Sequence, residues 1–172
     1  MKLLYPGVII FILLIITQTI FTKSKLNPQV QPINVSYCDL VNNPAQYDQK
    51  IIRIKAIYVY GFEGSLLYCP DCYQREFRTW VQVDESSSIY ANPHVKKKFK
   101  GNDHKGRTLS VIMIGKFHGK GGGYGHENSY QFQLDLICIE EATVLAQRAC
   151  SPSDLPKKLL QQINCNPSKK KN

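Results

Sequence analysis

Alternation of apolar and polar residues with a period of two runs through much of the chain and predicts β-strands. The pattern is clearest after Ser129, where every second residue is apolar: Tyr130, Phe132, Leu134, Leu136 and Cys138. Shorter or more continuously apolar runs, bounded by turn residues, occur in four earlier stretches. The five predicted strands lie near residues 50–60, 65–69, 79–83, 107–117 and 129–145.

Two short helices are predicted beside these strands. Ser36 is a good N-cap for a helix over residues 36–42, which Asn43-Pro44 should interrupt. Pro93 suits the start of a second helix between the third and fourth strands. A helix, three strands, a helical insert and two strands predict a mainly β protein. Its domain would be a small five-stranded barrel of the oligonucleotide/oligosaccharide-binding (OB) type.

The N-terminus carries an export signal. Residues 3–21 are apolar and uncharged, and as a helix they would span roughly 28 Å, close to the hydrocarbon core of a bilayer. We therefore expect residues 1–22 to form either a cleaved signal peptide or a retained signal anchor, so that the protein is secreted or membrane-anchored in the cell envelope. Residues 23–35 are predicted to be a linker, 36–149 the barrel domain and 150–172 a basic C-terminal tail.

Six cysteines follow the export signal, an even number that favours disulfides in an oxidising compartment. Their spacing does not determine the connectivity, although Cys150 and Cys165 flank the proline-containing tail and are the natural local pair. The candidates are Cys38, Cys69, Cys72, Cys138, Cys150 and Cys165.

The motif Cys69-Pro70-Asp71-Cys72 allows three interpretations. The first is disulfide pairing, either within the motif or from one member to Cys38 or Cys138. The second is a dithiol redox pair, which usually needs a helix after the motif, and no helical pattern follows here. The third is half of a zinc site, which would need further ligands. His118 and His126 bracket the turn between the last two strands and would complete it if the loops converge.

The start of the domain resembles a known group of proteins. Residues 38–50 and the strand that follows show a leucine, Asn43-Pro44, Tyr47, Lys50 and then an apolar run. This pattern is similar to the opening of uncharacterised bacterial proteins, secreted or membrane-anchored, that carry an OB-like domain. The resemblance implies the fold and no activity. It also expects a glycine before the lysine, where this chain has Gln49.

Two glycine-rich loops mark the expected binding surface. They are residues 61–64 and 119–128, which fall where an OB barrel places its ligand loops. Aromatic and polar residues of these loops and of the second and third strands are the candidate contacts: Phe62, Glu63, Tyr68, Trp80, Tyr124 and His126. Alternatively, Tyr124 and His126 pack back on the barrel and hold the hairpin in place.

The net charge and the absence of known catalytic motifs limit the classes of function that the sequence supports. The net charge is +9, with basic residues clustered in one insert: Lys96, Lys97, Lys98, Lys100, Lys105 and Arg107. This cluster is either a solvated basic face without a partner or a surface for an anionic membrane or envelope component, whereas export argues against nucleic acid. No serine-hydrolase elbow or zinc-protease motif is present. The sequence thus favours a non-enzymatic binding or structural module without a cofactor, and the alternative is a zinc- or dithiol-dependent activity at Cys69, Cys72, His118 and His126.

Overall fold

The computed structural model describes residues 31–61, 64–72, 78–84, 89–99 and 106–146, together with Cys165. The expected export segment 1–22, most of the expected linker and tail, and Phe62, Glu63, Lys100, Lys105 and Cys150 lie outside these residues. Within the described ranges, no helix has the length and hydropathy needed to cross a bilayer.

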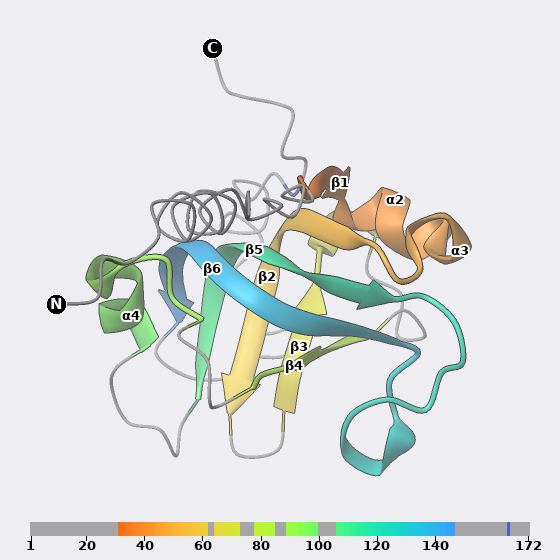
Figure 1. Cartoon of the computed structure of the whole chain (residues 1–172). Coiled ribbons are helices and arrows are strands. Elements are labelled where there is room, and N and C mark those ends of the chain that lie inside the picture. Colours follow the sequence, from red (N-terminus) through yellow and green to blue (C-terminus); the bar gives the residue numbers. More distant parts are fainter. Residues whose placement is uncertain are drawn as a thin grey trace, which may run out of the picture. The chain divides into compact units, whose positions relative to one another are not determined.

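The five predicted strands are confirmed and close into a barrel (Figure 1). Following the sheet, β2 pairs with β3, β3 with β4, β4 with β6 and β6 with β5, and β5 pairs back with β2. All of these pairings are antiparallel except that of β4 with β6, which is parallel. The bounds are β2 (Ile51–Gly61), β3 (Gly64–Tyr68), β4 (Thr79–Gln82), β5 (Arg107–His118) and β6 (Phe132–Ala146).

A short sixth strand, β1 (Ile33–Ser36), lies beside the barrel in a segment that the sequence places mostly in the linker. It pairs in parallel with the first half of β2, from Ile52 to Lys55, while β3 pairs with the second half of the same edge. Only Val35 of β1 is buried. A four-residue strand with one buried side chain shows no periodicity, which is why the pattern did not predict it.

The helices also match the prediction. Helix α2 (Tyr37–Asn42) begins after Ser36, whose hydroxyl oxygen accepts a hydrogen bond of 3.0 Å from the backbone N–H of Asp39. The chain breaks at Asn43 and continues as α3 (Pro44–Tyr47). Helix α4 (Pro93–Phe99) is the predicted insert between β4 and β5, and it packs against β6. Figure 1 shows α4 well separated from α2 and α3.

Tyr37 joins helix α2 to the barrel. Its side chain is buried, and its hydroxyl donates to the carbonyl oxygen of Leu67 over 2.8 Å and lies 3.1 Å from the hydroxyl of Thr79. These contacts tie the start of α2 to both β3 and β4. The barrel interior is otherwise filled by large apolar side chains, including Ile52, Ile54, Leu109, Met113, Phe117, Phe132 and Leu134.

Gln49, which precedes β2, has a backbone conformation that usually favours glycine. Its φ is +62°, in the left-handed region where a side chain other than that of glycine costs about 1–2 kcal/mol. Its backbone N–H donates to the carbonyl of Phe117 over 2.7 Å, and its amide nitrogen lies 3.0 Å from Nδ1 of His118. The turn into β2 therefore keeps the glycine-like backbone, and the Gln49 side chain gains a contact with β5.

Replacing Gln49 with glycine and with alanine separates these two effects. Both variants lose the amide contact, but only alanine retains the backbone strain. We expect Gln49→Gly to be more stable than Gln49→Ala by about 1 kcal/mol in urea unfolding. Equal stabilities for the two variants would show that this turn relaxes out of the left-handed region.

Candidate functional site

The parallel pairing of β4 with β6 forms a seam that closes the barrel. Its register places Thr79, Val81, Phe132 and Leu134 inward, where all four are buried. The alternating residues point outward in two adjacent rows, in which Trp80 lies beside Gln133 and Gln82 beside Asp135. We refer to these four outward residues as the seam face.

Trp80, the only tryptophan of the chain, is partly exposed and is held in place by neighbouring groups. Its indole N–H donates to the side-chain oxygen of Gln82 over 3.1 Å. Its ring meets that of Tyr130 edge-on, with ring centroids 5.0 Å apart. Tyr130 comes from the hairpin between β5 and β6, so this hairpin holds the tryptophan in one orientation.

The hairpin itself is fixed by backbone pairing and by Tyr124. The backbones of Tyr124 and Tyr130 exchange hydrogen bonds of 3.0 and 3.1 Å, and the Tyr124 hydroxyl donates to the carbonyl of Lys120. The Tyr124 ring lies 6.0 Å from that of His118. Tyr124 therefore packs within the hairpin and against β5, as the alternative interpretation of this residue proposed.

Gly125 lets the hairpin approach Trp80. Its φ is +66°, and a β-carbon at this position would lie only 2.6 Å from Cδ2 of Trp80 and 2.7 Å from Cδ2 of Tyr130. No side chain fits at such distances without displacing the aromatic pair. At the hairpin tip, η3 (His126–Asn128), Glu127 and Asn128 also have positive φ, so this turn contains backbone strain.

A chain of hydrogen bonds crosses the surface beside Trp80. The amide nitrogen of Gln49 lies 3.0 Å from Nδ1 of His118, and Nε2 of the same ring lies 2.6 Å from Oδ2 of Asp135. The other carboxylate oxygen of Asp135 accepts a hydrogen bond of 2.7 Å from Gln133. Each member thus orients the next. Both ring nitrogens of His118 and both oxygens of Asp135 are engaged within the protein.

An open groove adjoins this surface at the far end of the seam. It has a volume of about 480 Å³ and is lined by Gln82, Val83, Asp84, Asp135 and Leu136. Gln82 links it to the indole of Trp80, and Asp135 links it to His118. Among the described residues, its lining includes two carboxylates and no basic side chain.

The structure brings some of the sequence candidates together and separates others. Trp80 and Tyr124 both contribute to this surface, although Tyr124 packs within the hairpin. His126 is exposed at the hairpin tip, and Tyr68 is fully buried. Sequence reasoning missed the residues of the surface that depend on pairing: Gln82, Tyr130, Gln133 and Asp135. Their outward positions follow from the period of two in β4 and β6, but the pattern does not show that these two strands are neighbours.

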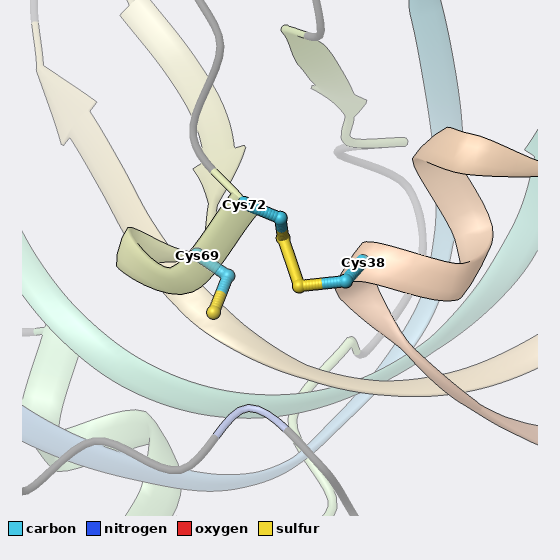
Figure 2. A group of neighbouring side chains, drawn as sticks. All are labelled: Cys38, Cys69 and Cys72. Carbon is cyan, nitrogen blue, oxygen red and sulfur yellow. A yellow bond between two sulfur atoms is a disulfide. The ribbon is translucent and has the colours of Figure 1, made fainter.

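The cysteines form a second cluster, at the end of β3. Cys38 of α2 is bonded to Cys72 of η1 (Pro70–Cys72), as one of the interpretations allowed (Figure 2). Cys69 is bonded to Cys165, 96 residues further along the chain, which corrects the expected pairing of Cys165 with Cys150. The local pair was favoured by sequence distance alone, whereas the fold decides which sulfurs meet. Two disulfides are typical of a protein in an oxidising, extracytoplasmic compartment.

Cys138 of β6 is a free thiol. Burial raises its pKa, and the nearby carboxylate of Glu140 raises it further, so the protonated and unreactive form is favoured.

Potential metal ligands gather at the same place. Among the described residues, the group with three or more such ligands is Cys38, Cys69 and Cys72, and their sulfurs lie within 4.8 Å of one another. His118 and His126, which the sequence offered as further zinc ligands, are not part of this group. The sulfurs are engaged in disulfides, so the cluster would bind a metal only after reduction.

Comparisons with protein families, with characterised proteins and with solved structures give no match to this chain.

Gly125 and Gly122 provide a matched test of the Trp80 environment. Both have positive φ, +66° and +63°, but only a β-carbon at position 125 meets neighbouring atoms. We expect Gly122→Ala to lose about 1 kcal/mol of stability through backbone strain, and Gly125→Ala to lose about 1–3 kcal/mol more through overpacking. Only Gly125→Ala should shift the emission spectrum of the sole tryptophan. Identical spectra for the two variants would show that the hairpin does not hold Trp80.

Proposed function

We propose that this protein is a non-enzymatic, extracytoplasmic binding module with an OB-like barrel. The export segment at residues 1–22 would deliver or anchor it in the cell envelope. The observation that carries the proposal is the seam face, where a partly exposed tryptophan is immobilised beside a groove and a connected set of polar side chains. Such a combination of a flat apolar surface with oriented polar groups is typical of ligand sites.

The strand order supports the OB-like assignment. The five barrel strands in chain order are β2, β3, β4, β5 and β6. The first, β2, pairs with the second and fourth, and the third, β4, pairs in parallel with the fifth, β6. An OB barrel binds its ligands on the face of its second and third strands and on the loops beside them. Trp80 lies on the third barrel strand, β4, and contacts the hairpin between the fourth and fifth. Its position thus agrees with that of an OB ligand site.

The chemistry of the seam face favours a neutral, hydroxyl-rich ligand. An indole surface suits the apolar face of a sugar ring, and the amides of Gln82 and Gln133 can donate to and accept from hydroxyl groups. The carboxylate of Asp135 lines the groove and disfavours an anionic ligand there. Lys96, Lys97 and Lys98 belong to α4, which does not line the groove. We therefore infer that the ligand is a neutral oligosaccharide of the cell envelope rather than an anionic membrane surface.

The same geometry argues against catalysis at this site. His118 and Asp135 form a pair that resembles part of a catalytic triad, but a general base needs one ring nitrogen directed at the substrate. In this protein Gln49 holds one nitrogen of His118 and Asp135 holds the other. These two contacts support a positioning role for the pair within the proposed binding module.

Replacing Trp80 with alanine should weaken oligosaccharide binding by at least about tenfold, which corresponds to about 1.4 kcal/mol. The loss follows from removing the apolar surface on which a sugar ring would lie. Binding of the full-length protein to a panel of neutral oligosaccharides, followed by titration calorimetry on the best ligand, measures this effect.

Ile33→Ala provides the control, because Ile33 is an exposed apolar residue on β1, which is not part of the seam face. It should leave the affinity unchanged. Equal affinities for Trp80→Ala and the unmodified protein would contradict the proposed site. Binding to vesicles of anionic lipid, with no binding to any neutral oligosaccharide, would contradict the ligand class.

A further inference from the structure

Three cysteine sulfurs from two different disulfides lie within 4.8 Å of one another. Cys38 and Cys72 form one bond, and the third sulfur, that of Cys69, belongs to the bond with Cys165. Figure 2 shows the sulfur of Cys69 beside the bridge between α2 and η1. A small movement of one side chain would therefore bring a sulfur of one disulfide into contact with the other.

The two disulfides differ in exposure. Cys69 is fully buried and Cys165 is 3% exposed, whereas Cys38 and Cys72 are both partly exposed. A reductant in solution can thus approach the outer bond, Cys38–Cys72, but is blocked from the inner bond, Cys69–Cys165. Exchange with a neighbouring sulfur needs no such access, because the attacking thiolate is already inside the protein.

The backbone places Cys72 close to Cys69. The two residues flank Pro70 and Asp71 in a tight turn, in which the N–H of Cys72 donates to the carbonyl of Cys69 over 3.3 Å. Two cysteines at this spacing readily form a disulfide with each other, as in dithiol redox motifs. The turn therefore permits a third pairing, Cys69–Cys72, in addition to the two that the structure contains.

We propose that this cluster is a thiol–disulfide exchange site, through which a dithiol reductant that reaches only the outer bond opens the inner one. One thiolate of the dithiol attacks Cys38 and displaces Cys72 as a thiolate. The second thiol of the dithiol then displaces Cys38, so that the reductant leaves as a cyclic disulfide after giving up two electrons. The Cys72 thiolate attacks Cys69, the Cys69–Cys72 bond forms, and Cys165 leaves as a thiolate that takes up a proton.

These exchange steps give one defined set of disulfides and thiols. One dithiol is oxidised, and the protein retains one disulfide, Cys69–Cys72, with thiols at Cys38 and Cys165. The bond that joins Cys165 to the barrel is broken without direct contact between it and the reductant. This inference is independent of ligand binding at the seam face, since it uses none of the same residues.

Two variants test the exchange without confounding it with loss of the outer disulfide. Cys38→Ser leaves the Cys72 thiol beside Cys69, whereas the double variant Cys38→Ser/Cys72→Ser removes both outer thiols. Both lack the outer bond, so any loosening of the structure is common to them. The experiment labels thiols of the folded, full-length variants with an alkylating reagent in the absence of reductant, quenches in acid and maps the labelled peptides.

We expect Cys165 to be labelled at least tenfold faster in Cys38→Ser than in the double variant, with Cys69 and Cys72 recovered as a disulfide-linked peptide. In the unmodified protein, one equivalent of dithiothreitol should give label on Cys38 and Cys165. Tryptophan emission verifies that each variant is folded. Equal labelling of Cys165 in the two variants, or label on Cys72 with none on Cys165 in Cys38→Ser, would overturn the proposal.

Discussion

The closure of the barrel depends on a short parallel pairing between β4 and β6. The antiparallel strands β2, β3 and β4 form one unit and the long hairpin of β5 and β6 forms another. Ten residue pairs join β2 to β5, but only four join β4 to β6. Because side chains alternate between the two faces, a shift of one residue at this seam would turn Trp80 inward and Val81 outward. The register that buries the core therefore also builds the surface where the ligand is proposed to bind.

Local pattern was sufficient to predict most of the secondary structure. The period of two in residues 51–61 and 132–146 marks strands because one face of each is buried, and the Ser36 cap sets the start of α2. The positive φ of Gln49, in contrast, has no signal in the sequence pattern. Strand periodicity and helix capping depend on residues that are close together in the sequence, so one sequence is enough to predict them.

Features that depend on distant pairing could not be predicted in the same way. Gln133 and Asp135 become part of one surface with Trp80 only because β4 and β6 are adjacent, and no local signal identifies that adjacency. The disulfides show the same limit. Cys165 has a nearer candidate partner in sequence, yet the position of Cys69 at the end of β3 determines the bond. Contacts between residues far apart in the sequence are determined by the strand topology, and the spacing of motifs does not reveal them.

The contacts within the seam face would let the proposed ligand bind without rearrangement of the barrel. Trp80 is held by Gln82, Tyr130 and the backbone of Gly125, and Asp135 is oriented by His118 and Gln133. Groups that are already fixed lose little conformational entropy when a ligand arrives.

The bond between Cys69 and Cys165 has a consequence for biosynthesis. A chain that emerges from its N-terminus presents Cys38, Cys69 and Cys72 to an oxidising compartment well before Cys165 follows. Two of the three possible pairs among these early cysteines use Cys69 and leave Cys165 without its partner. The native bond must therefore form late, and it then encloses β4, α4, β5 and β6 in a single covalent ring. Cross-linking of the barrel is thus completed only after Cys165, which follows β6 in the chain, has reached the same compartment.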